Sequence, residues 1–206
     1  MLTLIPIILS YLIGSISFSY LVVKWTKGTD VRQYGSGNAG ATNTLRVLGW
    51  GPALLVLALD IGKGILAVAL GQAMSAGHTW VPIVCGAMVI VGHNWPVFFG
   101  FRGGKGVATM IGVTAMLAFW PSLMLSALAI LVIALTRYVS VGSLTYALLF
   151  PIVVWWLDRP VELVWFGLFV FVMTWFKHRS NLVKLWRGTE NKIGQKWQGG
   201  DVDGSA

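Results

Sequence analysis

The chain has 206 residues, of which 56% are hydrophobic and 11% are charged, and its formal net charge at pH 7 is +8. Its uncharged runs are long enough to cross a hydrocarbon layer of about 30 Å, which excludes an ordinary soluble domain. The runs are continuously apolar instead of alternating, which excludes a transmembrane β-barrel. The composition therefore predicts an all-α, polytopic integral membrane protein.

The first apolar run covers residues 2–23. It is not typical of a signal peptide, because Lys24 and Lys27 follow the run and no basic residue precedes it. The other basic residues also lie in segments that flank apolar runs, as the positive-inside rule requires of cytoplasmic loops. The excess positive charge therefore indicates membrane lipids with anionic headgroups as partners, and no nucleic acid.

The charge pattern also predicts a topology. Five single crossings are expected, at residues 2–23, 52–72, 80–98, 141–157 and 161–176. When the loops that carry Lys and Arg are placed on the cytoplasmic side, the N-terminus lies outside and the C-terminus lies inside. We expect residues 1–198 to form one transmembrane domain. The polar, Gly-rich residues 199–206 are expected to be a disordered tail.

The uncharged run 106–136 begins and ends on the cytoplasmic side of this topology. As one helix, it would extend about 46 Å, too long for one upright crossing. Because Trp120-Pro121 stands near its middle, we interpret the run as a helical hairpin of two short arms that turns at Pro121 and either spans a thinned bilayer or is re-entrant and shielded by neighbouring helices. Counting its two arms gives seven transmembrane helices in all. One long tilted helix is the alternative, but it would place Arg137 outside, against the charge rule.

Residues 35–46, GSGNAGATNTLR, form the first of two glycine-rich segments. Successive small residues let backbone N–H groups converge on an anion, and the hydroxyl groups and the guanidinium of Arg46 add donors. The segment therefore indicates an anion-binding site. The alternative is a flexible loop at the membrane interface.

Residues 100–109, GFRGGKGVAT, form the second glycine-rich segment. It is not a nucleotide-binding P-loop, because Phe99 stands where that pattern needs glycine and Gly106 stands where it needs Ser or Thr. A glycine-rich turn that opens a helix, with Lys105 in the first turn, is nevertheless suited to binding phosphate. The alternative interpretation makes Arg102 and Lys105 lipid anchors.

Two further cytoplasmic segments carry polar side chains. Residues 137–145 place glycine and hydroxyl groups at a helix start, where N-capping and close packing are the alternative explanation. In residues 177–181, His178 and Asn181 lie three apart and share a helix face. His178 either orients a substrate hydroxyl or accepts its proton. Basic anchoring at the membrane surface is the alternative for this segment.

Within the spans, Asp60 and Lys63 also lie three apart, and we interpret them as a structural ion pair. His93, close to the inner face, could brace the second glycine-rich segment. Cys85 is interpreted as a small core residue. The sequence has no cluster typical of metal ligands and no Ser-His-Asp or Cys-His arrangement, so neither a metal nor another cofactor is expected. An enzyme built from these residues would hold anions with cations and backbone donors.

Three stretches resemble the signature segments of one enzyme family. GSGNAGATNTLR (35–46), GHNWPVFFGFRGGKGVAT (92–109) and VGSLTYALLF (141–150) are similar, in this order and spacing, to those of the PlsY family of bacterial acyl-phosphate:glycerol-3-phosphate acyltransferases. The resemblance covers the chain up to about Trp186. It implies transfer of a fatty acyl group from acyl phosphate to the 1-hydroxyl of glycerol 3-phosphate. The product would be lysophosphatidic acid, formed in the first acylation of phospholipid synthesis at the cytoplasmic face of the bacterial inner membrane.

The resemblance also implies a mechanism and a set of site residues. The chain lacks the His-x4-Asp dyad of other glycerol-phosphate acyltransferases, so the phosphate of the donor is expected to accept the hydroxyl proton. Functional coupling to the enzyme that makes acyl phosphate is a further implication. The residues implied around the reacting groups are Ser36, Arg46, Lys105, His178 and Asn181. Those implied in completing the phosphate sites are Asn38, Thr42, Asn43, Gly103, Gly104 and Ser143.

A membrane transporter of phosphate or organophosphates is the alternative function. A transporter would be expected to contain an internal repeat and a polar path that reaches both faces. Here the polar segments gather on one predicted side of the membrane, which favours the enzyme.

Overall fold

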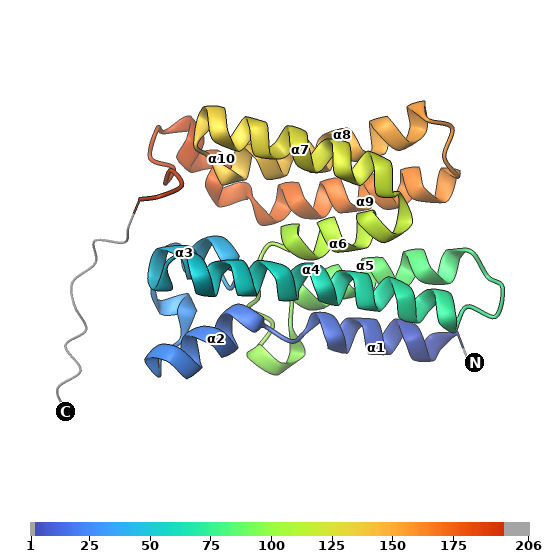
Figure 1. The fold of residues 1–206 in the computed structure, drawn as a ribbon, viewed down its shortest axis with the longest axis horizontal. Helices are drawn as coiled ribbons and strands as arrows, with labels where there is room; N and C mark the ends of the chain where they lie inside the picture. Colours follow the sequence, from blue (N-terminus) through green and yellow to red (C-terminus); the bar gives the residue numbers. More distant parts are fainter. Residues whose placement is uncertain (1–2, 196–206) are drawn as a thin grey trace.

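A computed structural model describes residues 3–195, and every regular element in this range is a helix, as the sequence predicted. The long helices run along one common direction and form an elongated bundle (Figure 1). The tail predicted for residues 199–206 lies outside the described residues.

Five stretches are long and apolar enough to cross a membrane: Leu4–Lys27, Trp50–Ala73 (α4), Trp80–Phe99 (α5, Trp80–Asn94, continued by η2, Val97–Phe99), Phe119–Thr136 (α7) and Val139–Trp156 (α8). A sixth candidate is the bent pair α9 (Val161–Lys177) and α10 (Arg179–Trp186), whose axes differ by 59°. Each predicted single crossing therefore coincides with a helical stretch. The predicted total of seven depends on the short α6 (Val107–Leu117), whose 11 residues would span about half of the hydrocarbon layer.

The first span is two helices instead of one, α1 (Leu4–Gly14) and α2 (Phe18–Lys27). At the break, the ammonium group of Lys63 in α4 donates hydrogen bonds to the carbonyl oxygens of Gly14 at 3.2 Å and Ile16 at 2.8 Å. The same ammonium lies 2.8 Å from a carboxylate oxygen of Asp60. Backbone carbonyls freed within a bilayer need an internal donor, and Lys63 supplies it. This arrangement supports the structural interpretation of the pair.

The run 106–136 is a hairpin of two helices, as predicted, but it does not turn at Pro121. The chain breaks at Ala118, and Pro121 lies in the first turn of α7, where a missing backbone N–H leaves no hydrogen bond unmade. The arms are also unequal, because α7 has 18 residues against 11 in α6. A buried hydroxyl cluster fastens the turn to α8, since the Tyr146 hydroxyl lies 2.7 Å from both Thr114 and Ser122.

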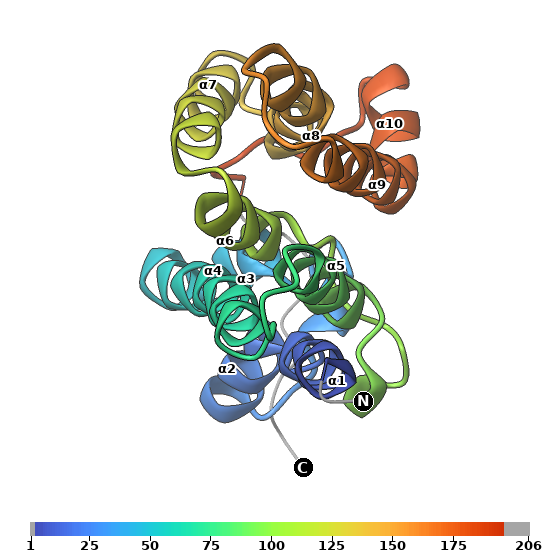
Figure 2. The same ribbon diagram turned by 90° about the vertical axis from the view of Figure 1, so that its right-hand side faces the viewer.

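Seen along the helices, the chain forms two groups, α1–α6 and α7–α10, with α6 facing the second group (Figure 2). The two groups share one apolar core, which extends from Val68 of α4 through Val113 of α6 to Phe150 of α8. Glycine lets α4 and α6 approach closely, because a Cβ at Gly112 would collide with the backbone of Ile61. The core therefore makes the bundle one unit.

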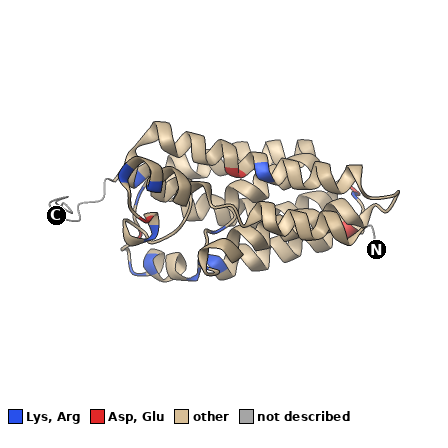
Figure 3. Cartoon of the chain, turned by 90° about the horizontal axis from the view of Figure 1, so that it is seen from below, with Lys and Arg blue, Asp and Glu red and all other residues tan. Residues whose placement is uncertain are grey.

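Lys and Arg residues gather at one end of the bundle and are sparse along its length (Figure 3). This end carries α3 (Ala41–Leu48), α10 and the connection between η2 and α6 (Figure 1). By the positive-inside rule it is predicted to be the cytoplasmic end. The connections α4–α5 and α8–α9 lie at the opposite end.

Candidate active site

The two glycine-rich segments are packed against each other at the basic end of the bundle. The amide of Gly104 donates a hydrogen bond to the carbonyl oxygen of His93 at 3.1 Å. A Cβ at Gly104 would collide with the carbonyl oxygen of Ala39 in the first segment and with Nε2 of His93. A Cβ at Gly103 would lie 2.6 Å from Cδ of Pro96. Both positions therefore require glycine, and His93 braces the second segment as the sequence suggested.

Arg32, shortly before the first segment, holds the start of the second segment. Its guanidinium pairs with the carboxylate of Asp30 at 2.7 Å and donates to the carbonyl oxygens of Phe99 at 2.8 Å and Arg102 at 3.2 Å. The carbonyl of Phe99 immediately precedes the second glycine-rich segment, and that of Arg102 lies within it. Arg32 thus has a structural task in holding the start of this segment.

Asn43 organises the first segment. Its side-chain oxygen accepts a hydrogen bond from the backbone amide of Ser36 at 2.9 Å, and its nitrogen donates to the carbonyls of Val31 at 3.0 Å and Tyr34 at 2.9 Å. Asn43 is buried, whereas Ser36, and also Asn38 and Thr42, are half-buried. The amide of Asn43 is thus engaged within the protein and fixes the loop that carries Ser36.

Lys105 is connected to the C-terminal helices by a chain of polar groups. Its ammonium donates to the side-chain oxygen of Asn181 at 2.5 Å, and the side-chain nitrogen of Asn181 donates to Glu190 at 2.6 Å. The same carboxylate oxygen accepts a hydrogen bond from the hydroxyl of Ser140 at 3.1 Å. The second glycine-rich segment, α10 and the start of α8 therefore meet at Lys105.

Burial has the largest effect on the pKa values of the two site cations, Lys105 and Arg46. It lowers the pKa of Lys105 to about 8, against the opposing effect of the Glu190 carboxylate. Burial also lowers the pKa of Arg46, again opposed by Glu190, although a guanidinium stays protonated. The charge of Arg46 acts on Lys105, and the Glu190 carboxylate acts on both cations. A partly dewatered pair of like charges is a strong attractor of phosphate.

His178, at the junction of α9 and α10, is buried with 2% of its surface exposed. Its Nδ1 lies 2.8 Å from the carbonyl oxygen of Thr174. A carbonyl can only accept, so Nδ1 carries the proton, and Nε2 of the neutral ring is an acceptor. His178, predicted to share a helix face with Asn181, lies at the bend between the two helices, and Asn181 lies in the first turn of α10. Lys105 acts electrostatically on His178.

Of the hydroxyl groups in residues 137–145, that of Ser140 joins the hydrogen-bonded series that runs from Lys105 through Asn181 to Glu190. Ser143, predicted as a phosphate-binding residue, is buried, and its hydroxyl donates to the carbonyl of Val139 at 2.8 Å. Sequence reasoning did not single out Ser140 or Glu190. Glu190 lies in a coil after α10 without any periodic pattern, and its one signal was a lone carboxylate among basic residues.

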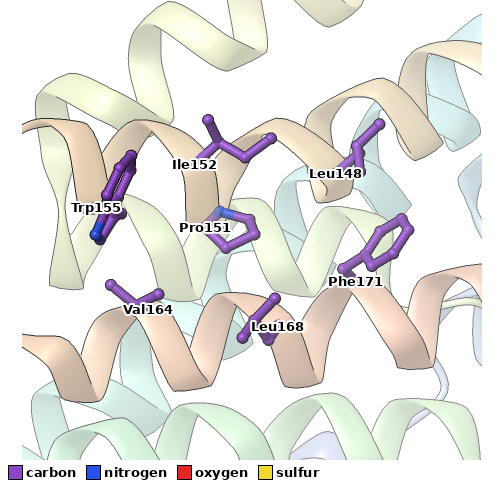
Figure 4. Close-up of a pocket in the computed structure, with 7 residues that line it drawn as sticks. All are labelled: Leu148, Pro151, Ile152, Trp155, Val164, Leu168 and Phe171. Atoms are coloured by element: carbon purple, nitrogen blue, oxygen red, sulfur yellow. The ribbon is translucent and has the colours of Figure 1, made fainter.

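A separate apolar groove lies farther along α8 and α9 (Figure 4). Its lining residues are Leu148, Pro151, Ile152, Trp155, Val164, Leu168 and Phe171. None of them is charged, so the groove suits hydrocarbon chains and not phosphate.

The fold and the site together define a polytopic helical membrane protein with a basic, glycine-lined polar site at one end of its bundle. Comparison with known proteins narrows this class to one family. The family model described as glycerol-3-phosphate acyltransferase matches residues 4–188, and the chain belongs to this family.

Individual relatives agree with the family match. The chain is 49% identical over 195 residues to the glycerol-3-phosphate acyltransferase of Shouchella clausii (strain KSM-K16), covering 92% of this chain and 95% of that protein. It is 50% identical over 192 residues to the glycerol-3-phosphate acyltransferase of Halalkalibacterium halodurans, covering 91% and 93%.

Solved structures give the same result. The chain is similar to the crystal structure of PlsY, an integral membrane glycerol 3-phosphate acyltransferase, in its glycerol 3-phosphate form, with a TM-score of 0.88 and 35% identity over 93% of this chain and 96% of that one. The lysophosphatidic acid form of PlsY gives a TM-score of 0.86 over 93% and 95%. The resemblance noted in the sequence is therefore confirmed, and the chain is an acyltransferase of the PlsY type.

Proposed function

We propose that the protein transfers a fatty acyl group from acyl phosphate to the 1-hydroxyl of glycerol 3-phosphate, releasing lysophosphatidic acid and inorganic phosphate. The observation that carries the proposal is the meeting of Lys105, Arg46 and two glycine-rich backbones at one end of an apolar bundle. Both substrates carry a phosphate, and the acyl chain of the donor is apolar. A basic site at the end of a membrane-spanning bundle is suited to such a pair.

The chemical step needs no dedicated base from the protein. The glycerol hydroxyl oxygen attacks the acyl carbonyl carbon, and a tetrahedral intermediate forms. The bond between that carbon and the phosphate oxygen then breaks, and the departing phosphate takes the hydroxyl proton. This substrate-assisted route fits the absence of a His-x4-Asp pattern from the sequence.

Each site residue is assigned a role in substrate binding or charge stabilisation from the chemistry of its side chain. Lys105 and Arg46 bind phosphate and stabilise the charge that develops on it. Asn181 fixes the Lys105 ammonium through its 2.5 Å hydrogen bond. Nε2 of His178 is placed to accept a hydrogen bond from a glycerol hydroxyl and orient it. Ser36 adds a hydroxyl donor, and the loop around Asn38 and Thr42 completes the phosphate site with Gly103 and Gly104.

The site is proposed to face the cytoplasm of a bacterial cell, with the N-terminus outside the inner membrane. The concentration of Lys and Arg at the site end of the bundle supports this orientation (Figure 3). Acyl phosphate is a reactive donor, so functional coupling to the enzyme that makes it follows from the proposal.

The direct test uses the full chain purified in detergent with acyl phosphate and glycerol 3-phosphate. We expect inorganic phosphate and lysophosphatidic acid to appear in equal amounts without ATP, added metal or another protein. Acyl-CoA and acyl carrier protein thioesters, offered separately, test the donor. Product formation from a thioester but not from acyl phosphate would contradict the proposed donor.

A further inference from the structure

Glu190 occupies an unusual place for a carboxylate. Of the other acidic residues within positions 3–195, Asp30 pairs with Arg32, Asp60 pairs with Lys63, and Asp158 and Glu162 lie at the far end of the bundle. In this part of the chain, Glu190 is thus the one carboxylate that acts on the site cations. An acidic group beside a phosphate site repels the substrate, so its presence needs a reason.

The segment that carries Glu190 crosses from the end of α10 to the start of α8. The backbone amide of Ile193 donates to the carbonyl oxygen of Arg137 at 2.8 Å, and the Arg137 guanidinium donates to the carbonyl oxygen of Ile193 at 3.3 Å. The Lys192 ammonium lies 5.7 Å from the centre of the Tyr138 ring. Residues 188–195, which we call the strap, are therefore fastened beyond Glu190 as well as before it.

The contacts of Glu190 define the orientation of the Asn181 amide. A carboxylate can only accept, so the amide nitrogen of Asn181 must face Glu190 and its oxygen must face Lys105. Ser140 holds the same carboxylate oxygen from α8 at 3.1 Å. The Lys105 ammonium has no acceptor and requires the amide oxygen, while Glu190 binds the nitrogen at the other end of the same amide, so the two contacts together hold Asn181 in one orientation.

We propose that Glu190 is a positioning residue of the acyl-transfer site: through Asn181 it fixes the Lys105 ammonium, and through its charge it keeps that ammonium protonated for phosphate binding. The inference rests on the proposed roles of Lys105 and Asn181. Glu190 itself is not required to touch either substrate.

The electrostatic surroundings of Lys105 make the second part of the proposal measurable. The groups that act on or face Lys105 are Glu190, Arg46, Lys184, Lys177 and His178. Of these, only the carboxylate raises the pKa of Lys105, which burial lowers to about 8. Loss of that charge must therefore lower the pKa of Lys105 further and deprotonate the ammonium nearer to neutral pH.

The test compares Glu190→Gln, Glu190→Ala and wild type in the purified full chain, with kcat/KM for glycerol 3-phosphate measured from pH 6 to 9.5. Glu190→Gln keeps the size and the acceptor oxygen but removes the charge. We expect its alkaline limb to move to lower pH by about one unit. Glu190→Ala also removes the acceptor, and we expect kcat/KM at pH 7 to fall about tenfold or more. Glu162→Gln, the same change at an exposed position at the far end of the bundle, is the matched control.

The outcomes separate this inference from the proposed function. Wild type without product contradicts the proposed function itself. Active wild type with an unmoved alkaline limb in Glu190→Gln overturns the role of Glu190, whatever Glu190→Ala does. Circular dichroism and thermal melting of each variant distinguish misfolding from a local effect. Because a merely structural strap would not change the pH of the limb, Glu190→Gln decides the matter even if Glu190→Ala fails to fold.

Discussion

Lys105 and Asn181 are 76 positions apart in the chain and are joined by a hydrogen bond of 2.5 Å. The contact connects the second glycine-rich segment with α10, and so connects the two groups of helices at their basic end. If Lys105 and Arg46 bind phosphate, removing either side chain must lower the rate of acyl transfer far more than it lowers the stability of the fold.

Lys105→Ala and Arg46→Ala are each expected to lower kcat/KM by about 10²–10³-fold, because each removes a charged donor from the phosphate site. The variants should still insert into membranes and elute as wild type in size-exclusion chromatography. Lys27→Ala, at an exposed basic position at the end of α2, is the control and should keep its activity. Near wild-type rates in both variants would contradict phosphate binding and support the interpretation of Lys105 and Arg46 as lipid anchors.

The pH dependence of the enzyme should report Lys105. Its pKa of about 8 is lowered mainly by burial, so the ammonium is charged below pH 8 and neutral above it. Because the charged form binds phosphate, kcat/KM is expected to fall as pH rises through about 8. Lys105→Arg should remove this limb, since a guanidinium stays protonated throughout the range. A limb at the same pH in Lys105→Arg would assign it to another group.

Gly104→Ala is expected to inactivate the enzyme. The added Cβ would meet the carbonyl of Ala39 and the ring of His93, so the loop must move away from the first glycine-rich segment. A displacement of about 1 Å near reacting groups commonly costs about 100-fold in rate. Gly62→Ala, with open space around its Cβ, is the control for the same change. Full activity in Gly104→Ala would show that the two segments need not touch.

Lys63→Met tests the ion pair inside the bundle. Removing the ammonium leaves the buried Asp60 carboxylate with only Nδ1 of His93, at 3.5 Å, beside it and the carbonyls of Gly14 and Ile16 without a donor. We expect a loss of about 3–5 kcal/mol in the free energy of unfolding, seen as a lower melting temperature in detergent. The double variant Asp60→Asn, Lys63→Met should recover part of this loss, because it removes the uncompensated charge. A double variant as unstable as the single one would contradict that account.

Cysteine labelling tests the proposed orientation. Trp120 lies next to the α6–α7 turn and is 65% exposed. In a Cys85→Ala background, Trp120→Cys should react with a membrane-impermeant maleimide added from outside the inner membrane. Lys27→Cys, at the opposite end of the topology, should react only after the membrane is opened. The reverse pattern would place the site on the outer face.

Apolar runs predicted the spans closely, because a bilayer imposes one length and one composition on every crossing. The run 52–72, for example, corresponds to α4, Trp50–Ala73. The break between α1 and α2 was not predictable in this way. Gly14-Ser15 stands at the break, but Lys63, the donor that satisfies the freed carbonyls, comes from another helix and lies outside the first run.

The candidate site was predictable where glycine, Lys and Arg stand in recognisable order, as in residues 35–46 and 100–109. The turn at Ala118 was misplaced at Pro121, because proline is tolerated in a first helical turn as well as at a break. Glu190 was missed because its importance lies in a contact with Asn181 and Ser140, which only the folded chain brings together.

The distribution of the site along the chain has a practical consequence. Arg46 precedes the α4–α5 connection, residues 74–79, whereas Lys105, Asn181 and Glu190 all follow it. That connection lies at the end of the bundle remote from the site (Figure 1). A gene divided there would encode two fragments, and each fragment would lack site residues that the other carries. Catalysis by the co-expressed fragments would then depend on the packing of α1 and α4 against α5 and α6, which makes this protein suited to serve as a split reporter of helix association in membranes.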